Sequence, residues 1–133
     1  MIIADTNLIA YLLIRGQRTP EAEAVYRKDP IWAAPRLWRS EFRNVLALSL
    51  RRKLIGMDEA LEAVERAERL MAGQEFEAES SRVLRLAATS GCSAYDCEFV
   101  ALAQNLGVFL VTSDQALITK FKPTVVSMTT FCS

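Results

Sequence analysis

Short apolar segments alternate with longer amphipathic segments along this 133-residue chain, and this alternation restricts the folds open to it. Val108–Thr112 is an uninterrupted apolar run rich in β-branched and aromatic residues, typical of a strand covered on both faces. Ile2–Ala4, Ile31–Ala34 and Val125–Val126 are predicted as further short strands. Because helical segments separate them, the strands are expected to run parallel. The sequence predicts a three-layer α/β/α sandwich with a short, mostly parallel central sheet.

Helices are predicted between these strands from capping residues and from apolar periodicity. The expected helices cover Thr6–Ile14, Pro20–Lys28, Pro35–Ile55, Asp58–Met71, Ala78–Thr89, Ala94–Leu106 and a short segment from Asp114 to Phe121. A chain of this length is large enough to bury its own core. Residues 1–133 are therefore expected to form one domain.

The cysteine content and the hydropathy indicate a cytoplasmic protein. Cys92, Cys97 and Cys132 are an odd number without CxxC spacing, which favours reduced thiols. The longest apolar run, Leu8–Ile14, is too short to span a bilayer. The N-terminus lacks the basic region and cleavage site of a secretory signal. We expect no membrane association.

Four acidic residues occupy positions that are not typical of solvent-exposed surface acids. Asp5 and Asp114 follow predicted strands, and the carboxyl ends of parallel strands meet at one edge of a sheet. Glu41 and Asp96 each lie on the apolar stripe of a predicted helix, where an isolated carboxylate is costly. Each has an alternative explanation: Asp5 and Asp114 as helix N-caps, Glu41 and Asp96 as partners of a buried arginine.

Taken together, the four acids predict a metal site. Two carboxylates about 4 Å apart repel by roughly 4 kcal/mol at an effective dielectric constant near 20, so a cation is expected between them. The chain has no histidine, and oxygen ligands select Mg²⁺ or Mn²⁺. Glu98 is either a fifth ligand or a solvated first-turn acid. Thr6, Asn7, Thr112 and Ser113 lie beside the acids and are predicted to orient them, hold metal waters or contact a phosphate.

The charge distribution indicates a polyanionic substrate despite a net charge of zero. Arg36–Lys53 contains six basic residues and one acid, whereas Asp58–Glu79 contains eight acids and two arginines. We interpret this as one basic and one acidic face. Arg36, Arg39 and Arg43 lie on the helix that carries Glu41, and are predicted to guide an RNA backbone past the metal. The alternative is that these arginines only solvate the helix surface.

Four segments in this order resemble the PIN-domain ribonucleases, in particular the VapC-type toxins of toxin–antitoxin pairs. They are Ile-Ile-Ala-Asp-Thr-Asn at the start, Ser40-Glu41, the segment Ser93–Ala103, and Leu-Val-Thr-Ser-Asp-Gln-Ala-Leu from Leu110. The resemblance covers essentially the whole chain. It implies Asp5, Glu41, Asp96 and Asp114 as the acidic metal-binding residues. It also implies metal-dependent endoribonuclease activity, homodimers, and inhibition by a small cognate antitoxin.

Two other functions remain open from the sequence. A phosphatase or phospho-receiver would use a similar fold, but the former would present a second aspartate where Asn7 stands. The chain is alternatively a metal- or RNA-binding module without turnover, or an interaction domain. In that reading a helical hairpin, Asp58–Thr89, exposes its apolar stripes to a partner, although such stripes are more often core.

Overall fold

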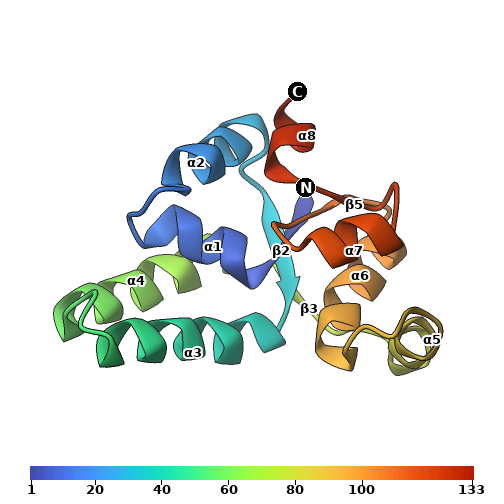
Figure 1. Cartoon of the computed structure of the whole chain (residues 1–133), viewed down its shortest axis with the longest axis horizontal. Coiled ribbons are helices and arrows are strands. Elements are labelled where there is room, and N and C mark those ends of the chain that lie inside the picture. The colour runs from blue at the N-terminus through green and yellow to red at the C-terminus, as the bar shows by residue number, and fades with distance from the viewer.

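The computed structural model describes all of residues 1–133, with a central sheet between layers of helices (Figure 1). Five strands and eight helices follow one another along the chain. They are β1 (Ile2–Ala4), α1 (Thr6–Leu13), α2 (Thr19–Lys28), β2 (Trp32–Pro35), α3 (Leu37–Arg51), α4 (Met57–Leu70), β3 (Glu75–Phe76), α5 (Ser80–Ser90), α6 (Ala94–Leu106), β4 (Leu110–Val111), α7 (Gln115–Lys120), β5 (Val125–Val126) and α8 (Met128–Cys132).

The sheet has the strand order β3-β2-β1-β4-β5. All four neighbouring pairs are parallel, and Ile3 pairs with Ala33 on one side and with Leu110 on the other. Every residue of β1 and β2 is buried, as expected of strands covered on both faces. The predicted α/β sandwich is confirmed, and the sheet is entirely rather than mostly parallel.

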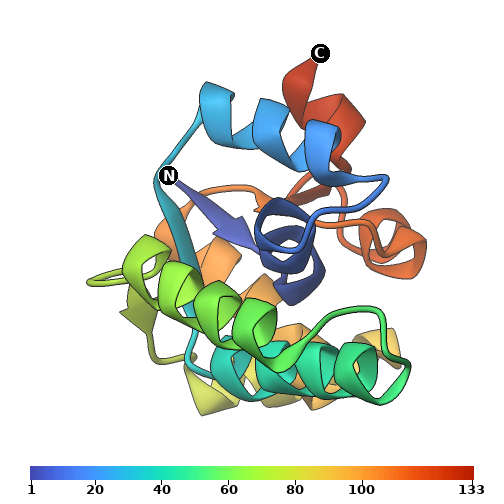
Figure 2. The ribbon, with the colours of Figure 1, turned by 90° about the vertical axis from the view of Figure 1, so that its left-hand side faces the viewer.

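Helices cover both faces of the sheet. In Figure 1, α1, α2 and α4 lie on one side, and α5 and α6 lie on the other. Figure 2, which views the molecule from the first side, shows α3 and α4 next to each other below α1 and α2. Helix α6 contacts β1, β2 and β4 and supplies much of the core. None of the eight helices combines the length and the apolar character that a membrane crossing needs.

The largest buried side chains of α3 anchor this helix in the hydrophobic core. Trp38 and Phe42 are each 1% exposed and lie one turn apart on α3, with ring centroids 5.9 Å apart. Fully burying such side chains contributes roughly 2–3 kcal/mol each. Together they fix the rotation of α3 about its axis, and hence the direction in which Glu41, between them, projects.

Several predicted boundaries differ from the structure. Pro35 is the last residue of β2 rather than the start of a helix, and Ile31 lies outside that strand. Helix α3 ends at Arg51 instead of Ile55, because Lys53 adopts a left-handed conformation with φ 57° that cannot continue an α-helix. Of Val108–Thr112 only two residues belong to the sheet. Strand β3 and helix α8 were not predicted, since two and five residues are too short for a periodic signal.

The prediction of separate basic and acidic faces is wrong where the basic segment, Arg36–Lys53, meets the acidic segment, Asp58–Glu79. Arg39 lies 2.6 Å from both Glu75 and Glu68, and Arg36 lies 3.3 Å from Glu77. Because β3 pairs with β2, residues 75–77 come to lie beside the first turns of α3. The positive charges at the start of α3 are therefore compensated within the chain.

Helices α4 and α5 do not form the predicted hairpin. Helix α4 packs against α3 and α1, whereas α5 packs against α6 on the other side of the sheet. Strand β3 lies between them in sequence and forms one edge of the sheet. The buried face of α4 is formed by Ala60, Ala63 and Ala67, whereas Met57 and Leu61 are 59% and 60% exposed.

Candidate functional site

Asp5, Glu41, Asp96 and Asp114 line one cavity of about 450 Å³ at the carboxyl ends of the strands. Each acid comes from a different part of the fold. Asp5 joins β1 to α1, Glu41 lies in the second turn of α3, Asp96 in the first turn of α6, and Asp114 precedes α7. All four acids singled out in the sequence are thus brought together, although they are up to 109 positions apart.

Two of these acids are also helix caps. Oδ1 of Asp5 accepts a hydrogen bond from the backbone N–H of Thr6 at 2.7 Å. Oδ1 of Asp114 accepts from the backbone N–H groups of Ala116 and Leu117 at 2.9 and 3.2 Å. The capping explanation and the site explanation hold together, because the cap bonds of Asp114 leave its Oδ2 free, and a carboxylate oxygen that accepts one hydrogen bond, as in Asp5, keeps a second lone pair.

Buried threonines orient two of the carboxylates. The hydroxyl of Thr112 donates to Oδ2 of Asp5 at 2.5 Å and accepts from the backbone N–H of Asp114 at 3.1 Å, so it ties the ends of β1 and β4 together. The hydroxyl of Thr6 donates to Oε1 of Glu41 at 2.7 Å. Both threonines are 4% exposed or less. Such hydroxyls hold carboxylates in a fixed direction.

The other two predicted polar neighbours have different positions. Asn7 lines the cavity with its side chain exposed. The hydroxyl of Ser113 lies 3.2 Å from that of Tyr11 and makes no hydrogen bond to any of the four acids. Ser113 therefore connects the end of β4 to α1.

The cavity is electrostatically unfavourable for anionic side chains. Burial raises the pKa of Asp5, and the charges of Asp96 and Asp114 raise it further, against the lowering effect of its hydrogen bonds from Thr112 and Thr6. Burial also raises the pKa of Glu41, with added contributions from Asp5, Asp96 and Glu98. The pKa of Asp96 is raised by burial first and by Asp114 second.

No positively charged side chain offsets the burial and mutual repulsion of these acids. The cavity is lined by no lysine or arginine, and none of its four acids takes part in an ion pair. The alternative in which buried arginines neutralise Glu41 and Asp96 is therefore not what the structure has. Carboxylates gathered without a cation are the donor set that a hard divalent ion requires.

The acids are not packed tightly around a single point. No three acidic or cysteine side chains are close enough, as they stand, to hold one ion together. Mg²⁺ is commonly bound through one or two carboxylates while it keeps several of its waters, so it does not require three acids around one point. The carboxylate oxygens of the cavity suit such an ion in their chemistry, and Asp5, Glu41, Asp96 and Asp114 are the residues that would hold it.

Glu98 and the arginines lie outside this group. Glu98 does not line the cavity, although its charge is felt by Glu41. Burial raises its pKa, and Glu77 adds to the effect. The guanidinium of Arg39 is engaged by two glutamates, whereas Arg43 is exposed and makes no ion pair.

Sequence reasoning missed the neutral part of the wall. Ser40, Asn44 and Tyr95 line the cavity beside the acids, together with Leu37 and Val45. Leu37, Asn44 and Val45 lie three or four residues from Glu41, so helical spacing places them on the same face of α3, whereas Ser40 is its immediate neighbour in the chain. That signal was present in the sequence, but polar residues at this spacing are common on any solvated helix.

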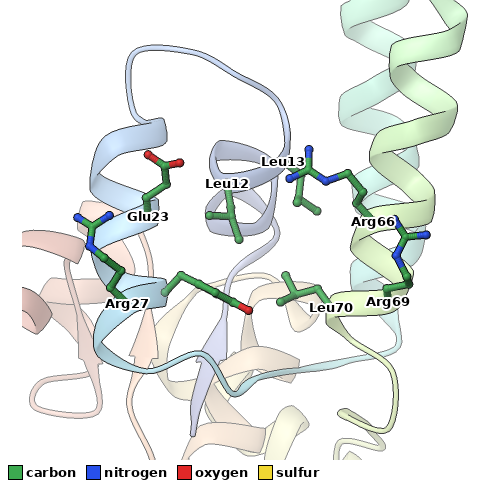
Figure 3. A pocket seen from close by; sticks show the side chains of 8 residues that line it. Leu12, Leu13, Glu23, Arg27, Arg66, Arg69 and Leu70 are labelled. Atoms are coloured by element: carbon green, nitrogen blue, oxygen red, sulfur yellow. The ribbon is translucent and has the colours of Figure 1, made fainter.

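A second, larger cavity lies between α1, α2 and α4. In Figure 3, Leu12, Leu13 and Leu70 are set between Arg27 and Glu23 of α2 and the two arginines of α4, Arg66 and Arg69. Its volume is about 570 Å³. It holds one acid against three arginines, so its chemistry is the reverse of the carboxylate cavity.

The fold is an all-parallel α/β sandwich with four acids at the carboxyl ends of its strands. Comparison with known families identifies the class of protein to which it belongs. The PIN domain, as a family, matches residues 2–121, and this chain belongs to that family. Members of this family are generally nucleases. No match to a curated protein was found.

Three solved structures share the fold. PAE2754 from Pyrobaculum aerophilum superimposes with a TM-score of 0.78 at 20% identity, covering 98% of this chain and 85% of that one. FitAcB from Neisseria gonorrhoeae gives 0.71 at 21% identity, covering 96% and 98%. FitAB bound to the IR36 DNA fragment gives 0.74 at 20% identity, covering 96% and 95%.

Proposed function

We propose that this chain is a Mg²⁺- or Mn²⁺-dependent endoribonuclease and the toxin of a toxin–antitoxin pair of the VapC type. One observation carries the proposal: Asp5, Glu41, Asp96 and Asp114 line one cavity that contains no cationic side chain. Membership of the PIN-domain family supports the nuclease part. Residues 1–133 would then be a single catalytic domain.

A bound divalent ion would supply the charge that neutralises a phosphodiester and lowers the pKa of an attacking water. The chain supplies the rest. Thr112 and Thr6 hold Asp5 and Glu41 in place through their hydroxyls. Oε1 of Glu41 is occupied by Thr6, while Oε2 has no hydrogen-bond partner in the chain. Oε2 is therefore the atom available to orient a water or accept its proton.

RNA cleavage tests this proposal directly. Wild type should cut RNA with Mg²⁺ or Mn²⁺ and stop when a chelator is added, and Asp96→Asn should be inactive while remaining folded. Glu62→Gln is the control. It changes an exposed acid that does not line the cavity, so it should leave cleavage unchanged. If wild type binds RNA or metal without cleaving, the non-catalytic module is the better description.

The partner part of the proposal includes a homodimer and a small cognate antitoxin. The cavity of Figure 3 supports a protein partner. Its three leucines and three arginines suit a segment with apolar and acidic side chains. A cytoplasmic location, also proposed, agrees with three free cysteines. The product of a short adjoining reading frame, if it is the antitoxin, should inhibit cleavage. Arg27→Glu with Arg66→Glu should weaken that inhibition without changing cleavage by the free chain.

A further inference from the structure

Tyr95 is a large aromatic residue exposed at the mouth of the carboxylate cavity. It precedes Asp96 in the first turn of α6, lines the same cavity, and is 63% exposed. By contrast, Trp32 and Trp38 are at most 1% exposed. The Tyr95 ring has no aromatic partner and no cation above it within the chain. Its contribution to the folded state is small for its size, which leaves its position unexplained by packing.

Three neutral polar side chains line the same cavity as Tyr95. Ser40 and Asn44 lie one turn apart on α3, and Asn7 lies at the start of α1. All three side chains are exposed, and none makes a hydrogen bond within the chain. The cavity therefore offers amide and hydroxyl groups and one aromatic face beside its acids, with Glu41 between Ser40 and Asn44 on α3 and Asp96 next to Tyr95 on α6.

This combination suits a nucleobase better than a phosphate. The lining has no cationic side chain and its acids oppose a phosphate, so a phosphate would be held by a metal ion at the carboxylates and not by the neutral side chains around Tyr95. An aromatic face stacks on any base, and amides and hydroxyls reach the hydrogen-bonding edges of an unstacked base. The cavity volume of about 450 Å³ is within the range of pockets that hold small ligands.

We propose that Tyr95 is a stacking platform for one unpaired base of the RNA, next to the phosphodiester presented to the carboxylates. The inference rests on the proposed nuclease function and adds a residue that positions the substrate. A base in a duplex is already stacked between its neighbours, so Tyr95 can only engage a base in a single strand, loop or end. Ser40 and Asn44 then face the edge of that base from α3.

The test compares variants on a short single-stranded RNA whose cleavage position has been mapped. Tyr95→Ala should lower kcat/KM about tenfold, within the range that base stacking on an aromatic side chain provides. Tyr95→Phe keeps the ring and should cleave within about twofold of wild type. Leu84→Ala is the control, because Leu84 is 65% exposed on α5 and does not line the cavity. All three variants should melt at the wild-type temperature.

Abasic substitution identifies the base. Removing the base beside the cleaved bond should lower kcat/KM of wild type by a similar factor, yet have little further effect on Tyr95→Ala. The proposal is overturned if Tyr95→Ala cleaves like wild type, or if the losses from the variant and the abasic site multiply independently.

Binding separates this inference from the proposed activity. Fluorescence anisotropy with the same labelled RNA and Mn²⁺ measures affinity whether or not cleavage occurs. If wild type binds without cleaving and Tyr95→Ala binds more weakly, the nuclease proposal fails and the stacking role stands. If wild type and Tyr95→Ala bind equally, or neither binds, the stacking role is wrong.

Discussion

Thr6 donates a hydrogen bond to Glu41 over 2.7 Å, joining the first residue of α1 to the second turn of α3. Burial, together with the charges of three neighbouring acids, raises the pKa of Glu41, and this hydrogen bond partly opposes that rise. Thr6 itself is 4% exposed, so its hydroxyl is not available to solvent. A neutral hydroxyl, and not an arginine, therefore keeps this carboxylate in place beside Asp5.

Removing that hydroxyl should impair the site more than the fold. Thr6→Val keeps the shape of the side chain but cannot donate to Oε1 of Glu41. Loss of a residue that orients a metal-binding group typically costs about 10- to 100-fold in metal affinity or activity. We expect a loss of this size in cleavage and a higher metal requirement, measured by kcat at increasing Mn²⁺. Thr6→Ser retains the donor and should retain most of the activity; equal loss in both variants would contradict the assigned role.

Asp96→Asn should stabilise the metal-free protein while abolishing cleavage. Burial and Asp114 raise the pKa of Asp96, so its ionised form destabilises the folded state at neutral pH. The penalty is complete above the raised pKa and disappears as the pH falls below the ordinary value of 3.8. In chelator, the variant should therefore melt a few degrees above wild type at pH 7, and this gain should shrink in acid. A lower melting temperature at pH 7 would assign Asp96 a structural role.

Mn²⁺ should raise the melting temperature of wild type more than that of Asp5→Asn or Asp114→Asn. A ligand that binds only the folded state stabilises it by an amount set by its concentration and affinity, about 2.7 kcal/mol at 100 times Kd. Differential scanning fluorimetry at several Mn²⁺ concentrations measures this shift. Glu62→Gln, an exposed acid on α4, should respond like wild type. A rise of the same size in all four proteins would place metal binding elsewhere.

The parts of the structure that sequence predicts here are those encoded by periodicity and strand direction. Ile2–Ala4 and Val108–Thr112 read as buried strands because they are uninterrupted apolar runs next to helices, and Leu110–Val111 within the second run is β4. Once those strands are parallel, Asp5 and Asp114 must lie at the same edge of the sheet, so their proximity follows. Glu41 and Asp96 were recognisable because a carboxylate on an apolar stripe conflicts with its surroundings.

The parts that sequence does not predict depend on pairs of distant residues or on exposure. Glu75–Phe76 is too short for its alternation to be recognised, and only its pairing with β2 makes it a strand. That pairing also sets Glu75 against Arg39, which made the inferred charge separation wrong there. Tyr95 lies on a helix start where an aromatic residue gives no signal of its own; its significance comes from being 63% exposed at a cavity.

Glu75 should stabilise the protein in a pH-dependent way. It accepts hydrogen bonds from Nε and Nη2 of Arg39 at 2.6 and 3.0 Å and from Nε1 of Trp38 at 2.8 Å, and its side chain is 13% exposed. The bond from Arg39 is the main reason that its pKa lies below the ordinary value. Glu75→Gln removes the charge-assisted bonds, each of which contributes about 1.5–3 kcal/mol, so a loss in this range is expected at pH 7.

The pH profile distinguishes the charge from the shape of the side chain. Because the pKa of Glu75 is lowered by folding, its stabilisation is complete above its ordinary pKa of 4.5 and is lost as the pH falls through the still lower value in the folded state. Urea unfolding should therefore show a constant gap between wild type and Glu75→Gln from neutral pH to about pH 5, which then closes in stronger acid. Glu77→Gln is the control, because Glu77 is 86% exposed in its pair with Arg36 and exposed pairs contribute little. A gap that persisted unchanged in acid would mean that packing against Trp38, and not the ion pair with Arg39, anchors β3 to α3.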